Sequence, residues 1–355
     1  MNINEALQKT VEMRGSDLHI TVSLPPMMRI NGELKAYGDE PLSPADTFDI
    51  AKQILTENQL SVLQEKGEVD LSYVLPNVSR FRVNVYKQRG SYGIAFRVIS
   101  IKIPTLDELG FPDTLKEMSL KPRGLFLVTG PTGSGKSTTL AAMVNHINLN
   151  RNCHVITLEE PIEYLHRHNR CMINQREIGS DSLTFANGLR AALREDPDVI
   201  FVGEMRDLET IATAITAAET GHFVMSTLHT TGAAQTIDRI IDVFPPHQQQ
   251  QIKIQLAAVL EGVVSQQLLP TADGRWRVAA MEIMVTNNAI SNLVREGKTH
   301  QIPTIIQTSF RQGMKTMDYS LSELVRRGKI TRETAETHCV DADMLRRYMM
   351  QSGSL

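Results

Sequence analysis

The chain has 355 residues, of which 41% are hydrophobic, 22% charged and 5% aromatic. This composition is typical of a folded globular protein and excludes the disordered, fibrous and disulfide-stapled classes. The length predicts two domains, or one large domain with an accessory. The formal net charge of -3 leaves no overall positive field to hold the chain on nucleic acid or anionic lipid, so any such contact would have to be local.

The three cysteines, Cys153, Cys171 and Cys339, are unevenly spaced and form no C-x-x-C pair. They predict neither a disulfide framework nor a structural zinc site, and a reducing cytoplasm fits them best. The polar amino terminus does not resemble a secretory signal, and no apolar run approaches the roughly 18 residues of a membrane-spanning helix. We therefore expect a cytoplasmic protein that is not integral to a membrane.

Short alternating segments dominate residues 1–100, which we expect to form a small α+β domain. Apolar residues fall at every second position in 81–85 and again in 94–98. A turn around 89–93 separates the two segments. This pattern is typical of a half-buried β-hairpin.

Two helices are expected in this domain, at 5–13 and 43–65. The second begins with Ser43 followed by Pro44, which is a helix-start signal. Residues 101–122 carry three prolines and little continuous periodicity. We interpret them as the linker between two domains.

From residue 123 onward, apolar strands alternate with helical stretches. Continuous apolar strands separated by helices predict a parallel sheet that is covered on both faces. The expected strands are Leu125–Thr129, His154–Leu158, Val199–Val202 and Phe223–Thr227. We expect this α/β domain to span 123–270, and residues 271–355 to be mainly helical apart from a strand at 276–285.

The segment 130–137 matches the pattern G-x-x-x-x-G-K-[ST]. An expected strand precedes it and a helical stretch follows, which favours a phosphate-binding loop over a merely structural glycine-rich turn. In such a loop, backbone N–H groups surround phosphate oxygens, Lys136 reaches the β and γ phosphates and the Ser137 hydroxyl binds Mg²⁺. The expected ATP-binding residues are Gly130, Pro131, Thr132, Gly133, Ser134, Gly135, Lys136, Ser137 and Thr138.

Carboxylates follow two of the expected strands. The strand 199–202 leads into Gly203 and Glu204, and an acid at the carboxyl end of a strand near the phosphate loop suits a Mg²⁺ site. The segment 158–163 carries three glutamates directly after another strand. One of them could orient and deprotonate the water that attacks the γ-phosphate, and the alternative is a solvated acidic turn.

The strand at 223–227 delivers Ser226, Thr227 and His229 to the same edge of the predicted sheet. A polar side chain at this edge could sense the γ-phosphate. Because a lone histidine is more often structural than catalytic, this pattern alone leaves both interpretations open.

The run Leu193–Asp198, continuing into Val202–Asp207, resembles the signature of the secretion ATPase superfamily that drives type II secretion and type IV pili. Three further segments are similar to the PilT-type pilus-retraction ATPases of twitching motility: Gly15–His19, Asn174–Glu177 and Ala289–Glu296. The resemblance covers essentially the whole chain. The longer amino-terminal region and four-cysteine module typical of the assembly ATPases in this superfamily do not occur in the sequence.

The resemblance implies an α/β fold: a PAS-like domain, a RecA-like P-loop ATPase domain and a helical tail. It implies a homohexameric, Mg²⁺-dependent ATPase that uses domain rotation to power pilus retraction. The implied location is the inner face of the cytoplasmic membrane. The implied partners are a pilus platform protein and an accessory retraction ATPase. An accessory retraction paralogue, or another ATPase of the superfamily, is the alternative function.

The resemblance also implies particular catalytic residues. Glu163 falls in the catalytic acidic box, Glu204 at the Walker B position, where it is also a Mg²⁺ ligand with Ser137, and His222 and His229 in the histidine box. Amino-terminal arginines are implied near the γ-phosphate. The full set of expected catalytic residues is Glu163, Glu204, His229, Arg82 and Arg97.

Two positions depart from the family pattern: Glu160, where aspartate is usual, and Ser291, where arginine is usual.

A RecA-like nucleic-acid translocase would share the loop and the fold. It should also show a basic groove with interleaved aromatics, whereas the sequence contains no obvious basic cluster, so we expect no nucleic-acid partner. A nucleotide-dependent regulator without hydrolysis would be expected to lack catalytic acids such as Glu163 and Glu204.

Overall fold

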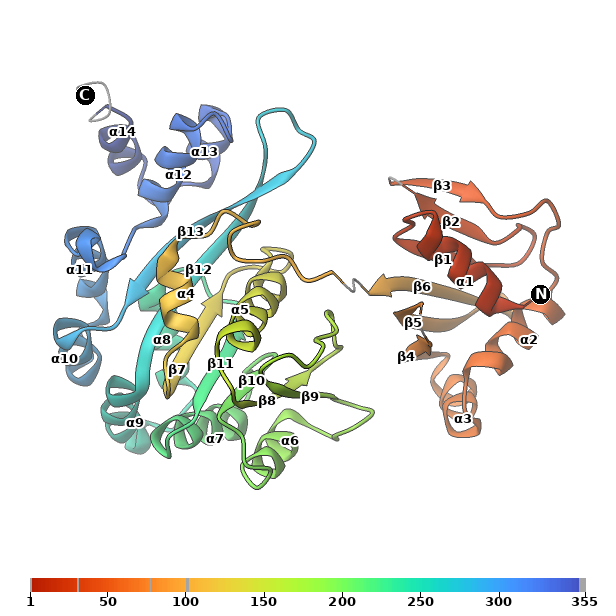
Figure 1. The fold of residues 1–355 in the computed structure, drawn as a ribbon, viewed down its shortest axis with the longest axis horizontal. Coiled ribbons are helices and arrows are strands. Elements are labelled where there is room, and N and C mark those ends of the chain that lie inside the picture. Colours follow the sequence, from red (N-terminus) through yellow and green to blue (C-terminus); the bar gives the residue numbers. More distant parts are fainter. Residues whose placement is uncertain (1, 31, 77, 100–101, 351–355) are drawn as a thin grey trace. The chain divides into compact units, whose positions relative to one another are not determined.

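The computed structural model describes residues 2–30, 32–76, 78–99 and 102–350, and the chain divides into two compact units (Figure 1). Unit 1 comprises Met1–Lys102 together with Glu163–Leu165, and unit 2 comprises Ile103–Ile162 and His166–Leu355. The elements of unit 1 are α1 (Ile3–Glu12), β1 (Asp17–Ile20), β2 (Met27–Ile30), β3 (Glu33–Ala36), α2 (Pro44–Ile54), α3 (Glu57–Lys66), β4 (Glu68–Leu75), β5 (Ser79–Gln88) and β6 (Ser91–Ile99).

Unit 1 contains an antiparallel six-stranded sheet of order β3-β2-β1-β6-β5-β4. Along β5, Phe81, Val83 and Val85 are fully buried and form one core with the apolar sides of the three helices. Arg82, between them, is exposed because successive side chains point to opposite faces of a strand. The predicted α+β unit and its hairpin are confirmed.

The single helix predicted at 43–65 is instead two helices. Ser43 begins α2 with a capping box to Asp46, and Thr56 begins α3 with a second capping box to Gln59. The Thr56 hydroxyl accepts a hydrogen bond from the Gln59 N–H at 3.3 Å. A capping box satisfies N–H groups that have no partner within a helix, so it stabilises a new helix start where the apolar periodicity alone suggested continuity.

Unit 2 contains the following elements: α4 (Asp113–Ser119), β7 (Gly124–Thr129), α5 (Lys136–Asn150), β8 (His154–Glu159), β9 (Met172–Glu177), α6 (Phe185–Ala192), β10 (Val199–Val202), α7 (Leu208–Glu219), β11 (Phe223–Leu228), α8 (Ala233–Asp242), α9 (Pro246–Val259), β12 (Leu260–Pro270), β13 (Arg277–Val285), α10 (Asn288–Glu296), η1 (Thr299–Gln301), α11 (Ile302–Thr308), η2 (Phe310–Gln312), α12 (Met317–Arg326), α13 (Arg332–His338) and α14 (Ala342–Met350).

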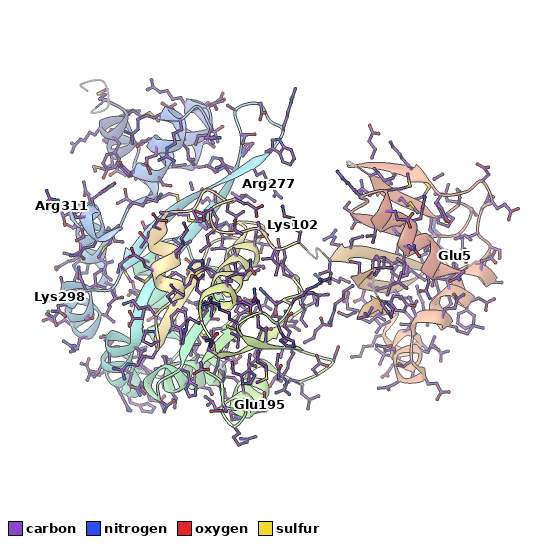
Figure 2. The ribbon with its side chains drawn as sticks, in the orientation of Figure 1. Glu5, Lys102, Glu195, Arg277, Lys298 and Arg311 are labelled. Carbon is purple, nitrogen blue, oxygen red and sulfur yellow. The ribbon has the colours of Figure 1, made fainter. Side chains whose placement is uncertain are left out.

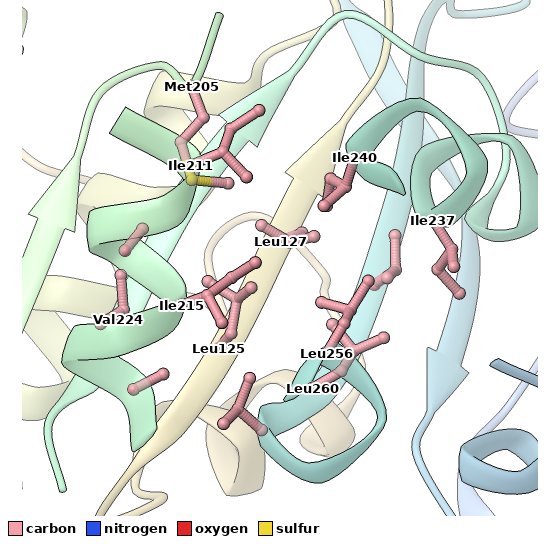
Figure 3. Close-up of a cluster of buried hydrophobic side chains, with 14 of the residues drawn as sticks. Leu125, Leu127, Met205, Ile211, Ile215, Val224, Ile237, Ile240, Leu256 and Leu260 are labelled. Atoms are coloured by element: carbon pink, nitrogen blue, oxygen red, sulfur yellow. The ribbon is translucent and has the colours of Figure 1, made fainter. Parts of the chain in front are cut away.

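The sheet of unit 2 has the order β13-β12-β7-β11-β10-β8-β9, and all neighbours are parallel except β12 and β13. Alternate residues of its strands enter two cores. Leu125 and Leu127 of β7 join a core with α7, α8 and α9, while Phe126 and Val128 join another with α4 and α5. Figure 3 shows the first core, including Leu125, Leu127, Met205, Ile211, Ile215, Val224, Ile237, Ile240, Leu256 and Leu260. The predicted parallel sheet, covered on both faces, is confirmed.

Residues 103–122 differ from the linker predicted there. Leu106, Leu115 and Met118 are buried against the sheet of unit 2, and α4 packs on α5. The prolines interrupt the helical periodicity, which is why the sequence suggested a linker, but the segment still contributes apolar residues to the core. The boundary predicted at residue 270 also differs, because it divides the hairpin of β12 and β13, which are paired from Gly262 with Val285 to Pro270 with Arg277.

The carboxy-terminal helices pack on this hairpin. Leu321, Ile330 and Leu345 form a small core with Leu269 of β12 and Ala280 of β13. The mainly helical carboxy-terminal region is therefore attached to the sheet of unit 2. Within the described residues, every helix is too short or too polar to cross a bilayer.

Candidate nucleotide-binding and catalytic site

The phosphate-binding loop connects β7 to α5, as predicted. Gly130, Gly133 and Gly135 have φ values of +140°, +79° and +90°, in the region that favours glycine. A Cβ on Gly130 would collide with the main-chain carbonyl of Gln266. The loop therefore needs glycine both for its path and for its close contact with β12.

The Lys136 side chain is buried within this loop. Its Nζ donates hydrogen bonds to the carbonyl oxygens of Gly130 at 2.7 Å and Pro131 at 3.0 Å, and the residue is only 9% exposed. The loop thus holds an ammonium group at the start of the 15-residue helix α5. A helix N-terminus and a cation together attract phosphate. Ser137, the next residue, is half-buried in the first turn of the helix.

Gln266 of β12 forms hydrogen bonds to the phosphate-binding loop and to the first turn of α5. Its Nε2 donates to the carbonyl of Ser134 at 2.7 Å, and its Oε1 accepts from the Thr139 hydroxyl at 2.7 Å. Gln266 is 2% exposed, so both hydrogen bonds are shielded from water. Gln266 could not be predicted from a local motif because it lies 132 positions from Ser134.

Glu204 and His229 come together at the carboxyl edge of the sheet. Glu204 follows β10 and His229 follows β11, and these strands are parallel neighbours beside β7. The Glu204 Oε1 accepts hydrogen bonds from Arg206 Nε at 2.6 Å and from His229 Nε2 at 3.0 Å. The predicted pairing of these two site residues at one edge is present, and Arg206 is an additional partner.

The charge of Glu204 is set by opposing effects. Burial disfavours its ionised form, but the Arg206 hydrogen bond and the charges of His229 and Arg206 outweigh burial, so the pKa of Glu204 lies below its usual range. The carboxylate is therefore ionised at neutral pH, as a Mg²⁺ ligand must be.

The hydroxyls of Ser226 and Thr227, which could have sensed the γ-phosphate, instead donate to backbone carbonyls in unit 2. Their hydroxyls donate to the carbonyl oxygens of Val202 at 2.8 Å and Gly203 at 2.7 Å. These bonds join the end of β11 to the end of β10. They fix the backbone that carries Glu204.

His222 is not part of this cluster. It immediately precedes β11, so it lies at the amino edge of the parallel sheet, opposite to His229. Its Nδ1 lies 2.9 Å from the carbonyl of Ala217 at the end of α7. In unit 2, His222 closes the turn between α7 and β11.

The side chains of Gln175 and Glu177 on β9 bind the backbone on both sides of Glu163. Glu177 Oε2 accepts from the Ile162 N–H at 3.1 Å, and Gln175 Oε1 accepts from the His166 N–H at 2.8 Å. Gln175 Nε2 also donates to Glu159 at 3.0 Å. The Asn174–Glu177 motif therefore tethers the segment that carries Glu163. Glu163 itself is grouped with unit 1, and its catalytic role stays a prediction.

Arg82 and Arg97 are direct cross-strand neighbours in unit 1. Both are exposed, and Arg97 Nε donates to Asp17 Oδ1 at 3.0 Å. Burial opposes ionisation of Asp17, but hydrogen bonds from Ser16 and Arg97 keep the pKa of its carboxyl below its usual range. The Gly15–His19 motif thus supplies a partner that orients one of the two candidate arginines.

The segment after His229 is anchored by two side chains of the β12–β13 hairpin. The Gly232 N–H donates to Ser265 Oγ at 2.8 Å, and the Ala233 N–H donates to Glu282 Oε1 at 2.8 Å. Burial raises the pKa of Glu282 even though this hydrogen bond opposes the shift. Neither residue was predicted, since neither belongs to a recognisable local motif.

A hollow of about 300 Å³ borders Glu204 and His229 on the side of α7 and α8. Its other polar lining residues are Arg206, Thr230 and Arg239, and no residue of the phosphate-binding loop lines it. The hollow is therefore separate from the phosphate position, which the loop geometry defines.

Ser137, in the first turn of α5, and Glu204, which follows β10, carry oxygen groups of the kind that binds Mg²⁺. The Ser137 hydroxyl and the ionised Glu204 carboxylate are ligand types that Mg²⁺ prefers. In the part of the chain that the structure describes, His, Cys, Asp and Glu side chains form no metal-holding group of three or more. Mg²⁺ usually retains waters and substrate phosphate oxygens rather than entering an all-protein cage, so a two-ligand contribution is sufficient.

A parallel sheet with a glycine loop, a buried lysine at a helix start and an acid at the carboxyl end of another strand defines a P-loop ATPase. The family model of the Type II/IV secretion system proteins matches residues 2–326, and the chain belongs to this family. The type IV pilus retraction ATPase PilT of Pseudomonas aeruginosa is 48% identical over 335 residues, covering 94% of this chain and 97% of PilT.

Two further comparisons agree with this assignment. The type IV pilus ATPase PilU of Pseudomonas aeruginosa is 40% identical over 354 residues, covering 100% of this chain and 92% of PilU. The crystal structure of the pilus retraction motor PilT with bound ADP superposes with a TM-score of 0.91 at 47% identity, covering 98% of this chain and 99% of that one. The predicted PilT-type family, the α/β fold and the ATPase class are confirmed.

Proposed function

We propose that this chain is a homohexameric motor that hydrolyses ATP to power retraction of type IV pili. The observation that carries the proposal is the full-length likeness to a retraction motor. It is supported by a phosphate-binding loop that buries Lys136 and by Glu204 at the carboxyl end of β10 in the same sheet. Identity is higher to PilT than to PilU, which favours a primary retraction motor over an accessory paralogue.

The proposed site residues divide the work of hydrolysis. Loop N–H groups and Lys136 bind the β and γ phosphates, and Gln266 keeps the loop in its binding shape. Ser137 and Glu204 would hold a Mg²⁺ ion, which would supply charge neutralisation for the phosphates. Glu163 orients the attacking water and accepts its proton. His229, hydrogen-bonded to Glu204, links the acid to the end of β11.

A ring explains why unit 1 carries exposed arginines. The transition state of phosphoryl transfer needs more positive charge than the loop supplies, and an arginine from another domain or subunit contributes ~10³–10⁵ in rate in related enzymes. Arg82 and Arg97 are the proposed donors. Their arrival and departure would couple hydrolysis to rotation of the domains.

Helix α10 is the proposed coupling element. Ile290 and Val294 are buried against unit 2, while Asn292 and Arg295 are exposed and joined by a hydrogen bond of 2.7 Å from Arg295 Nη1 to Asn292 Oδ1. The buried side explains why the helix folds, and the exposed pair is free to contact a partner. We place that partner at the inner face of the cytoplasmic membrane, as a pilus platform protein.

The test is pilus retraction in a host strain that lacks its own retraction ATPase. The parent chain should restore retraction, and Lys136→Ala should not. Asn292→Ala and Arg295→Ala should keep phosphate release near the parent rate while abolishing retraction, whereas Ser291→Ala should be mild. Parallel losses of hydrolysis and retraction in the α10 variants would make the helix merely structural. Failure of an expressed, ATP-hydrolysing parent to restore retraction would contradict the proposed function.

A further inference from the structure

The tip of the β12–β13 hairpin carries the chain's only tryptophan in an unusual setting. Trp276 is 75% exposed, between Arg275 and Arg277, which are also exposed. Figure 1 shows the loop projecting beyond the sheet. A tryptophan that served the fold would be expected to bury its large apolar surface.

Hydrogen bonds within the loop close it on both sides of the tip. The Thr271 N–H donates to the Trp276 carbonyl at 2.9 Å, and the Trp276 N–H donates to the Thr271 hydroxyl at 3.1 Å. Asp273 turns into the loop, where its Oδ1 accepts from the Arg275 N–H at 3.2 Å. The one carboxylate of the loop is therefore engaged with the loop itself.

A second basic segment lies beside the tip. The Ala272 N–H donates to the carbonyl of Lys329 at 2.8 Å, which brings residues 326–332 next to residues 271–277. Together the two segments carry six Arg or Lys residues and one Asp. No basic cluster was expected from the sequence, because the two basic segments are short and lie far apart in the chain.

Among the described residues, four of these six cations have no acidic partner. Arg327 pairs with Glu323 and Arg332 with Glu336, and Arg326 lies over the ring of Tyr319. Among the residues that the structure describes, Arg275, Arg277 and Lys329 form no ion pair. Unneutralised cations around a projecting indole attract an anionic surface into which the indole can insert.

We propose that the tip formed by Arg275, Trp276, Arg277 and Lys329 is a docking surface for an anionic lipid bilayer. Indole rings favour the boundary between headgroups and acyl chains, and each Lys or Arg near an anionic surface strengthens binding about fivefold. A projecting tip suits a membrane better than a nucleic acid, which is gripped in a groove with several aromatics. This inference rests on the proposed function and specifies its membrane-facing surface, since six weakly binding tips in one ring would act together.

The single tryptophan makes the test direct, because the tryptophan emission of the full-length chain, excited selectively over its tyrosines, reports on this tip alone. With vesicles containing phosphatidylglycerol, the emission should move to shorter wavelength and be quenched by brominated acyl chains. Pure phosphatidylcholine vesicles should have no effect. Arg275→Gln combined with Arg277→Gln should weaken binding roughly 30-fold, and Trp276→Ser should reduce cosedimentation with vesicles.

The matched control is Lys298→Gln combined with Arg311→Gln, which removes the same charge from exposed positions away from the hairpin (Figure 2). It should bind vesicles like the parent. If both double variants lost vesicle binding equally, net charge alone would explain the binding and the inference would be overturned. So does a fluorescence change that appears with single-stranded DNA or with rising protein concentration but not with vesicles. Phosphate release is measured on the same samples: active protein that ignores vesicles refutes the lipid surface only, and inactive parent protein refutes the motor.

Discussion

Replacing Gln266 by leucine tests whether β12 shapes the phosphate-binding loop. The substitution removes the donor to the Ser134 carbonyl and the acceptor for the Thr139 hydroxyl. The Thr139 hydroxyl keeps an alternative acceptor, the Gly135 carbonyl at 3.1 Å, so losing the Gln266 acceptor costs little free energy. A buried carbonyl left without a donor costs about 1–3 kcal/mol. If this cost falls on the loop, ATP affinity falls by roughly 5-fold to 150-fold.

The assay is ATP binding by titration, together with the thermal midpoint of the same variant to confirm folding. Gln267→Leu is the matched control, because the neighbouring side chain points to the other face and donates to the His338 carbonyl at 3.3 Å. It should leave ATP affinity within about twofold of the parent. Folded Gln266→Leu protein with parental ATP affinity, or an equal effect from Gln267→Leu, would refute the supporting role of Gln266.

Three further predictions follow from the site. Glu204→Gln should bind ATP yet release phosphate at least about 100-fold more slowly, because the shape remains and the charge does not; lost binding with normal turnover would reassign Glu204. Arg82→Gln with Arg97→Gln should lower hydrolysis about 10³-fold with near-normal ATP affinity, and unchanged hydrolysis would exclude these arginines. Because burial raises the pKa of Glu282 above the ordinary 4.5, its contribution to stability is lost as pH rises through the raised pKa. Glu282→Gln should therefore be more stable than the parent at neutral pH, and this advantage should shrink toward pH 4.5; a pH-independent difference in thermal midpoint would contradict it.

Local patterns made most of the fold and the nucleotide loop predictable. The loop 130–137 carries its chemistry within eight consecutive residues, and the buried parallel strands are continuous apolar runs. The strand β12 was missed because Ser265, Gln266 and Gln267 interrupt its apolar pattern. Those polar residues are buried or half-buried because they bond to neighbouring elements, which no local pattern reveals.

The site residues divide in the same way. The proximity of Glu204 and His229 was predictable because parallel strands end at one edge of the sheet. The roles of Gln175 and Glu177 could not be derived from sequence spacing, since they depend on which strand β9 pairs with. The sequence left open whether Ser226 or Thr227 senses the γ-phosphate, because it does not reveal the carbonyl groups of Val202 and Gly203 that their hydroxyls meet.

The most direct test of the central claim is phosphate release from ATP by the parent chain and by Lys136→Ala, compared at equal thermal stability. Because Lys136→Ala removes the cation held inside the loop, phosphate release should fall to background while the fold persists. Folded Lys136→Ala protein that releases phosphate within a few-fold of the parent rate would contradict it.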